Sequence, residues 1–128
     1  MDQYVTVNRI GNAVVVRFLP EWHSCWFDQM AVQEVRGLLK NLLDTTDAKA
    51  VVLNLATVHD FGADGLGMLV RFHGQSRAKG IAFTLSNLTP TLREHIRLDG
   101  LDRLFVIVDD EAEALATFAK IDQEDAPA

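Results

Sequence analysis

Hydrophobic positions follow two periods along the chain, one typical of β-strands and one typical of amphipathic helices. Alternation from Tyr4 to Arg9 predicts a strand with one buried face. The valine-rich run from Ala13 to Leu19 predicts a strand that is buried on both faces, and Pro20 ends it. Gly11-Asn12 between them suits the positive φ values of a tight turn. The chain is therefore predicted to begin with an antiparallel hairpin.

The rest of the chain alternates between helical periods and short apolar runs. The predicted helices run from a cap at Ser24, with Asp28 in the first turn, to Leu43, from near Ala63 to Lys79, from Thr89-Pro90 to Gly100, and from Asp109-Asp110 to Ile121. The predicted strands between them are Ala50 to Leu55, Ile81 to Ser86 and Leu104 to Val108. The order β-β-α-β-α-β-α-β-α predicts an α/β layered fold with a mixed, mainly parallel sheet.

Helical spacing also predicts which side chains face inward. The expected inward residues are Leu66, Leu69, Val70 and His73 in the second helix, Leu92 and Ile96 in the third, and Ala112, Leu115, Ala116 and Ala119 in the last. The 128 residues suffice for one domain with a single core. We expect that domain to span residues 1–121 and the polar residues 122–128 to form a frayed acidic tail.

Composition narrows the class of protein. A formal net charge of -6 argues against non-specific nucleic-acid binding, which needs clustered Lys and Arg. Cys25 is the only cysteine, so a disulfide within the chain is excluded and a reducing compartment fits. The N-terminal residues do not resemble a signal peptide, and no apolar run approaches the ~20 residues that cross a bilayer. We therefore expect a cytoplasmic protein without membrane insertion.

The stretch from Val51 to Leu69, VVLNLATVHDFGADGLGML, combines a buried strand, a polar turn and the start of a helix. It resembles the STAS domain family, as in bacterial anti-sigma factor antagonists. The corresponding sequence motif of that family runs roughly VVLDLSGVxxIDSSGLGxL. Leu53-Asn54-Leu55 falls on the LDL of that motif and Gly65-Leu66-Gly67 on its GLG. The segment from Leu98 to Phe105, LDGLDRLF, also looks like the family, so that the similarity covers about Val51 to Phe118 well.

The resemblance implies a phosphorylation site in the family, and this chain differs from the family at that site. Gly62 takes the place of the family aspartate, Ala63 that of the serine that a partner kinase phosphorylates, and Asp64 that of a second serine or threonine. In the resembled family, the phosphate abolishes binding to the anti-sigma kinase. Ala63 has no side-chain oxygen, so the resemblance implies a regulatory binding module that is not switched by phosphorylation at this position.

Asp60, Gly62, Asp64 and Gly65 are the predicted partner-binding residues of this loop. Asp64 allows three interpretations: it belongs to a surface locked in the binding-competent state, it partly imitates the phosphorylated state, or it only complements the dipole of the helix that starts there. Asp60 also has a plain interpretation, as a turn or capping residue.

Aromatic residues gather in the segment from Trp22 to Trp26, which has no family counterpart that we can match. In the resembled fold this segment lies on the same end of the sheet as the Gly62–Gly65 loop. We predict that Trp22 and that loop form one contact surface, for a partner protein or for a homodimer. The alternative is that Trp26 and Phe27 cover the core.

Two classes of function follow. One is a regulatory module whose partner is a serine-kinase-type anti-sigma factor or another STAS protein. The other is a STAS subunit for scaffolding or small-ligand binding, as in some membrane-transport complexes. An enzyme, a cofactor or a metal is not expected: His23-Ser24-Cys25 with His59 is a weak zinc pattern, and the glycines near Gly62 lack a P-loop lysine.

Overall fold

The computed structural model describes residues 5–18, 29–59 and 62–125, and for residues 29–32, 62–63 and 120–125 it describes the backbone alone. The elements are β1 (Val5–Ile10), β2 (Ala13–Phe18), α1 (Gln29–Thr45), β3 (Ala50–Asn54), α2 (Gly62–Ala78), β4 (Ala82–Ser86), α3 (Pro90–Leu98), the short 3₁₀ helix η2 (Leu101–Arg103), β5 (Val106–Val108) and α4 (Glu111–Asp125). The predicted order of strands and helices is confirmed, with η2 as an addition.

The strands form one mixed sheet in the order β1-β2-β3-β4-β5. β1 pairs antiparallel with β2, and every other neighbouring pair is parallel. The hairpin turns at Gly11, whose φ of 60° lies in the left-handed region that glycine adopts without strain. Because β2 to β5 run in the same direction, their carboxyl ends lie at one end of the sheet, and the connections after these strands start there.

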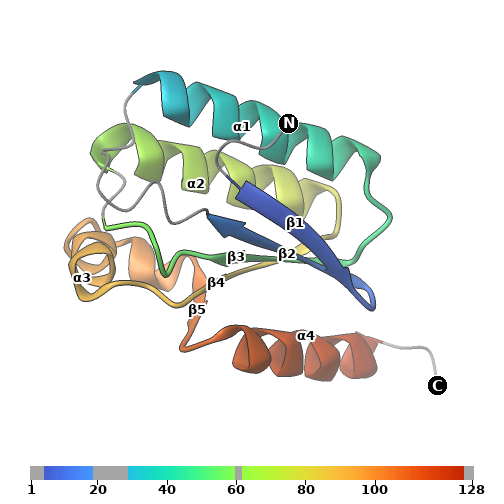
Figure 1. The fold of residues 1–128 in the computed structure, drawn as a ribbon. Coiled ribbons are helices and arrows are strands. Elements are labelled where there is room, and N and C mark those ends of the chain that lie inside the picture. The colour runs from blue at the N-terminus through green and yellow to red at the C-terminus, as the bar shows by residue number, and fades with distance from the viewer. Residues whose placement is uncertain (1–4, 19–28, 60–61, 126–128) are drawn as a thin grey trace.

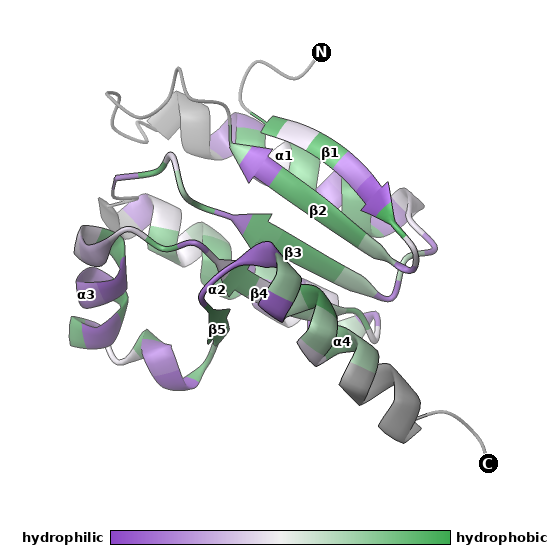
Figure 2. Ribbon diagram, turned by 60° about the horizontal axis from the view of Figure 1, so that its bottom comes forward, coloured by the Kyte–Doolittle hydropathy of each residue, from purple (hydrophilic) through white to green (hydrophobic). Residues whose placement is uncertain are grey.

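Helices cover both faces of this sheet. α1 and α2 lie on one face, α4 lies on the other, and α3 lies beside the carboxyl end of the strands (Figure 1). β2 and β3 are hydrophobic along most of their length, as central strands covered on both faces must be (Figure 2). The predicted α/β layered fold is therefore confirmed.

The two faces carry cores of very different size. The larger core joins the sheet to α1, α2 and α3, and its members include Val35, Leu39, Leu53, Leu69, Phe72, Leu92 and Ile96. The smaller core, under α4, consists of Val15, Val52, Val108 and Ala114, with half-buried Leu115 packed against it. Val51 and Val52 are neighbours in β3, yet they point to opposite cores.

Two predictions of inward faces are wrong. Val70 is 37% exposed, although Leu66, Leu69 and Phe72 of the same helix are buried. In α4 the buried alanine is Ala114, whereas the predicted Ala112, Ala116 and Ala119 are exposed. An alanine-rich helix has nearly the same hydrophobicity on every side, so tertiary contacts decide which of its faces is covered.

The C-terminal part differs from the prediction at two boundaries. Leu104 precedes the last strand, because the amides of Leu104 and Phe105 donate to the carbonyl of Leu101 at 3.0 and 3.2 Å and hold a turn there. β5 is therefore only three residues long. α4 continues past Ile121 to Asp125, so the helix extends into the segment that was expected to fray.

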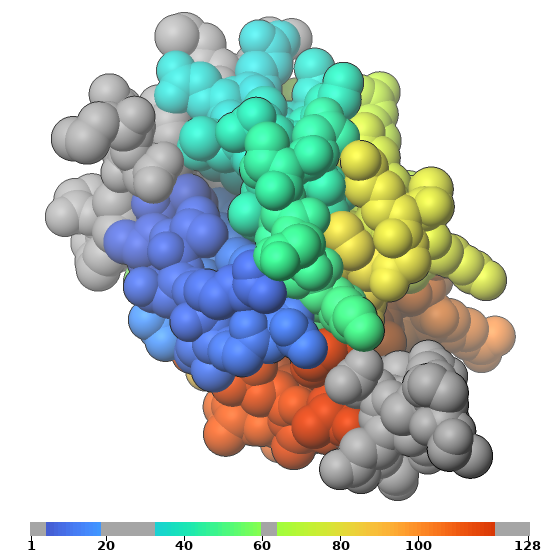
Figure 3. Space-filling model, turned by 90° about the vertical axis from the view of Figure 1, so that its right-hand side faces the viewer, coloured from blue at the N-terminus to red at the C-terminus, as the bar shows by residue number. Residues whose placement is uncertain are grey.

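A surface ion pair joins the end of α1 to the residue that follows α2. The carboxylate of Asp44 near the end of α1 pairs with Lys79 just after α2, at 2.9 Å. Figure 3 shows this face, with the end of α1 between the β1–β2 hairpin and the last turns of α2. The predicted cap at Ser24, with Asp28 in the first turn, lies outside the described residues.

Candidate partner-binding site

The connection between β3 and α2 leaves the carboxyl end of the sheet, and the predicted binding residues follow it. Its described part runs from Leu55 to His59, and α2 begins at Gly62. Val58 is 2% exposed and belongs to the large core, whereas His59 is exposed. Within the described part of the connection, the buried side chain of Val58 thus anchors the polar residues around it to the core.

Hydrogen bonds fasten this connection to the strands on both sides of β3. The hydroxyl of Thr57 donates to the carbonyl oxygen of Phe18 at the end of β2, at 2.9 Å. The amide of Leu55 donates to the carbonyl oxygen of Ser86 at the end of β4, at 3.0 Å. Within the connection, the amide of Val58 donates to the carbonyl oxygen of Leu55 at 3.0 Å. The carboxyl ends of three neighbouring strands therefore position one loop.

Thr89 holds the same loop from the side of α3. Its side chain caps α3 by accepting a hydrogen bond from the amide of Leu92 at 3.2 Å, and Pro90 follows in the first turn, as predicted. The hydroxyl also lies 3.2 Å from the carbonyl oxygen of Val58 and 3.0 Å from that of His59, to which it donates. One threonine side chain therefore joins the start of α3 to the candidate site.

A polar network under the loop connects it to α4. The carboxylate of Glu111, the first residue of α4, receives two hydrogen bonds from the Arg17 guanidinium, at 2.7 and 2.8 Å. The same carboxylate accepts a hydrogen bond from the side-chain amide of Asn54 at 2.5 Å. The side-chain oxygen of Asn54 in turn accepts from the amide of Ala56 at 3.0 Å, which shapes the start of the loop.

The charges of this network reinforce one another. Hydrogen bonds from the Arg17 guanidinium lower the pKa of the Glu111 carboxyl. The hydrogen bond from the side-chain amide of Asn54 also lowers this pKa, whereas partial burial of the carboxyl raises it. Glu111 raises the pKa of Arg17 in return, chiefly through the same hydrogen bonds. Local periodicity and motif spacing do not single out Arg17, Asn54 or Glu111 as partners. The signal was the asparagine in Leu53-Asn54-Leu55, where the family text has aspartate: an aspartate could not donate to Glu111.

At the start of α2, polar and small residues face the solvent. Asp64 lies in the first turn and is exposed, whereas Gly65 is buried. Gly67 is exposed as well, and a Cβ added to it would meet no atom within 4 Å, so space does not require a glycine there. Asp64, Gly67 and Val70 follow at a spacing of three residues and so lie along one outward side of the helix. Asp64 also complements the positive end of the helix dipole.

The predicted site residues are described to different extents. Gly62 and Ala63 form the first backbone positions of α2, so Ala63 stands at a helix start. Trp22 and Asp60 lie outside the described residues, and the predicted surface shared by Trp22 and this loop therefore stays a prediction. His23 and Cys25 of the weak zinc pattern also lie outside.

Within the described residues, no three or more His, Cys, Asp or Glu side chains form a group that could hold a metal ion. Among the described helices, none combines the length and apolar character that crossing a bilayer requires.

Most of the chain matches the model of a known protein family. The model of the STAS domain family matches residues 25–114, which is most of the chain and begins well before Val51. The protein therefore belongs to the STAS domain family.

Solved structures share the fold. A STAS domain protein from Planctomyces limnophilus has a TM-score of 0.80 at 18% identity, covering 90% of this chain and 97% of that one. The anti-sigma factor antagonist SpoIIAA of Bacillus, in its unphosphorylated form, gives 0.73 at 18% identity, covering 91% and 96%. A sulfate transporter family protein from Wolinella succinogenes gives 0.70 at 20% identity, covering 91% and 92%. SpoIIAA in its phosphorylated form also matches, with a TM-score of 0.66.

Proposed function

We propose that this protein is a regulatory protein–protein interaction module of the anti-sigma factor antagonist type, acting in the cytoplasm by binding rather than by catalysis. Its docking surface would consist of the β3–α2 connection and the outward side of the first turns of α2, with Asp60, Gly62 and Asp64 at its centre. Gly65, which was also predicted to bind the partner, is buried and would not contact it directly. The observation that carries the proposal is a set of hydrogen bonds. They hold this connection, which leads into α2, to the end of β2, to the end of β4 and to the start of α3.

A fastened loop is suited to recognition. Ordering a mobile segment on binding costs free energy, whereas residues 55–59, which are held by Thr57, Thr89 and buried Val58, have already lost most of that freedom. The first amides of a helix lack intrahelical partners and create a positive local potential. Asp64 and half-exposed Val70 add a charge and an apolar contact to the same side of α2.

The proposed module lacks the family's phosphorylation switch at residue 63. The structural relative SpoIIAA exists in a phosphorylated and an unphosphorylated form. Ala63 has a methyl group where the resembled text has serine, so no bond to phosphorus can form there. Asp64 carries at most one negative charge, against about -1.5 to -2 for a phosphoserine, so we favour a surface that stays competent to bind.

Affinity purification from the source cell tests this proposal. Wild-type protein should retain a kinase of the anti-sigma type or other STAS proteins, identified by mass spectrometry, and Asp64→Lys should lose them. Trp22→Ala should weaken the same complex if Trp22 shares the surface. Asp47→Lys is the matched control, because it reverses a highly exposed charge before β3, at the opposite end of the sheet, and breaks only a surface ion pair with Arg9. Equal recovery of every partner by wild type, Asp64→Lys and Trp22→Ala would contradict the docking surface.

A second candidate function is a STAS subunit for scaffolding or ligand binding in a transport complex. The observation in its favour is the similar fold of the sulfate transporter family protein from Wolinella succinogenes. The same purification separates the two candidates, because transporter subunits would then be recovered in place of a kinase.

A further inference from the structure

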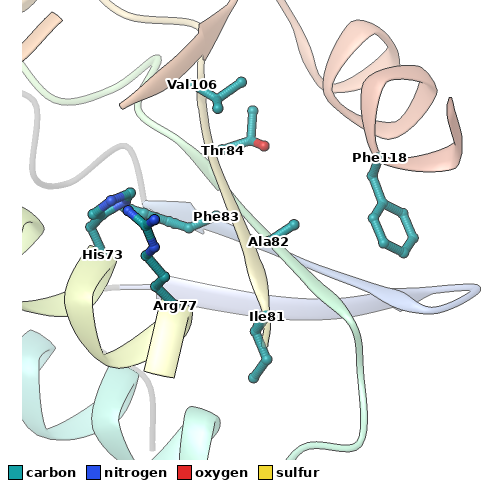
Figure 4. Close-up of a pocket in the computed structure, with 8 residues that line it drawn as sticks. All are labelled: His73, Arg77, Ile81, Ala82, Phe83, Thr84, Val106 and Phe118. Atoms are coloured by element: carbon teal, nitrogen blue, oxygen red, sulfur yellow. The ribbon is translucent and has the colours of Figure 1, made fainter. Parts of the chain in front are cut away.

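The other end of α2 borders a hollow that the proposed docking surface does not use. This hollow, of about 240 Å³, lies at the side of the sheet between α2, β4, β5 and α4 (Figure 4). Its lining includes His73 and Arg77 from α2, Ile81 and Phe83 from the β4 region, Val106 from β5 and Phe118 from α4. We call it the β4 notch.

The short last strand produces the notch. β5 pairs only with Thr84 to Ser86, so the first residues of β4, Ala82 and Phe83, have no strand on that side. α2 and α4 lie on opposite faces of the sheet, and each contributes side chains across this uncovered edge (Figure 4). Two uncovered residues are too few for a peptide to add as a strand, which needs a run of main-chain hydrogen bonds.

Most of the wall is apolar. Phe83 and Ile81, which belong to the large core, line the hollow from the α2 face of the sheet, half-buried Phe118 lines it from α4 on the other face, and Val106 is 44% exposed. Leaving a valine on an edge strand in water forgoes the free energy of burying it, and a ligand that covers Val106 would recover part of that free energy.

The polar groups of the notch are cationic or neutral. Arg77 and His73 stand one turn apart on the same side of α2. The guanidinium of Arg77 has no hydrogen bond or ion pair to any described residue, in contrast to those of Arg17 with Glu111 and Arg97 with Glu94. Of the eight lining residues, none is acidic, although the chain as a whole has a net charge of -6.

His73 is packed into the wall rather than fastened by a hydrogen bond. Its ring stands edge-on to Phe105 at 5.8 Å between centroids, and it lies tilted against Phe83 at 6.3 Å. Its Nδ1 atom is buried without a partner in the part of the chain that the structure describes. The unpartnered Nδ1 atom thus lies buried in an otherwise apolar corner, one helical turn from Arg77.

We propose that the β4 notch binds a small amphipathic anion, a carboxylate on a short aliphatic or aromatic body. Arg77 pairs with the carboxylate, and Phe83, Val106 and Phe118 cover the apolar body. The notch is smaller than the ~300–1,000 Å³ of typical ligand pockets, which limits the ligand to a few carbon atoms beyond its carboxylate. Arg77 lies in the last turn of α2 and Asp64 in the first, roughly 20 Å apart at 1.5 Å per residue, so this site is separate from the docking surface.

The test is a titration of the full-length, ¹⁵N-labelled protein with hexanoate, followed by amide chemical shifts. Hexanoate should produce saturable shifts at Phe83, Thr84, Val106 and Phe118. 1-Hexanol has the same body without the charge, and acetate has the charge without the body, so both should bind more weakly at these amides.

Variants assign the charge to its residue. Arg77→Gln should weaken hexanoate about tenfold, the loss expected for one charge-assisted pair at a partly exposed site. Arg71→Gln, an exposed arginine of the same helix that does not line the notch, should leave the affinity unchanged. Val106→Glu places a repelling carboxylate at an exposed position and should abolish the saturable shifts.

Three outcomes would overturn the proposal. They are equal binding of hexanoate and 1-hexanol, equal affinity of Arg77→Gln and Arg71→Gln, and shifts that lie away from the notch or never saturate. Shifts confined to the start of α2 would place the anion at the helix terminus instead, and would equally refute a site at Arg77.

Discussion

At the scale of the residue, the proposed loss of phosphorylation starts from the side chain of Ala63. Phosphoryl transfer needs a hydroxyl oxygen as nucleophile, and Ala63 has none, although it occupies the second position of α2. Gly62 likewise stands where the family text has aspartate. At this scale the proposed loss of switching depends on the identity of two residues and on nothing else in the fold.

Restoring both residues is the direct test. Incubated with ATP and the kinase that the purification identifies, wild-type protein should keep its mass, because residue 63 cannot accept phosphate. Ala63→Ser combined with Gly62→Asp should gain one phosphate, measured by intact-mass spectrometry and located by peptide fragmentation. A phosphate found on the wild-type protein would show that another residue, such as Thr57, is the acceptor.

Thr89 is a residue whose side chain serves two elements at once. Thr89→Val keeps the shape but removes both the helix cap and the donor to the loop carbonyls, so we expect a loss of about 1–2 kcal/mol in the free energy of unfolding, measured in urea. Thr91→Val, at an exposed position in the same helix, is the matched control and should change it little. An equal effect of the two substitutions would show that the double role of Thr89 carries no stability.

Among the described residues of α4, Glu111 at the start of the helix makes the side-chain hydrogen bonds that join it to the sheet. Glu111 connects it to β2 through Arg17 and to β3 through Asn54, directly under the start of the candidate docking loop. The rest of its described contact with the sheet is the small core around Ala114. The position of α4 therefore depends on an ion pair more than that of the other helices does.

This dependence predicts a response to pH. Because Arg17 and Asn54 lower the folded-state pKa of Glu111, its carboxylate adds stability above the unfolded-state pKa of about 4.3 and loses that contribution as the pH falls through the lowered folded-state value. At pH 7, Glu111→Gln should be about 1 kcal/mol less stable than wild type, allowing for the solvent around Arg17.

Urea unfolding at a series of pH values measures this effect. The difference between wild type and Glu111→Gln should shrink as the pH is lowered below about 4. Glu34→Gln, at an exposed site of α1, should follow wild type throughout. A difference that stays constant from neutral to acid pH would mean that the glutamine acts through shape and not through charge.

Over the whole molecule, stability is divided unequally between the two faces of the sheet. α1, α2 and α3 close a continuous core on one face, and α4 closes a small one on the other. Cavities in a core that is fixed from several sides relax poorly, whereas a single helix on a surface can shift to fill a gap.

Adjacent valines in β3 allow a matched comparison of the two faces. Val51 faces the large core and Val52 the small one, and both are at most 1% exposed. We expect Val51→Ala to cost about 2–3 kcal/mol and Val52→Ala about 1–2 kcal/mol in unfolding free energy. Chemical denaturation of both variants under the same conditions measures this, and a larger loss for Val52→Ala would show that α4 is held as rigidly as α1 and α2.

The sequence by itself determined the order of the elements, the Thr89-Pro90 start of α3 and the absence of a hydroxyl at residue 63, because these depend on local periodicity, capping chemistry and residue identity. Only the tertiary structure decided which side of α2 exposes Val70, that Ala114 is the buried alanine of α4, and that Arg17 and Asn54 meet Glu111. It also decided that β5 leaves the notch beside Phe83 uncovered. The physical reason is that these features depend on contacts between residues far apart in the chain, and a local pattern cannot show which surface a neighbouring element will cover.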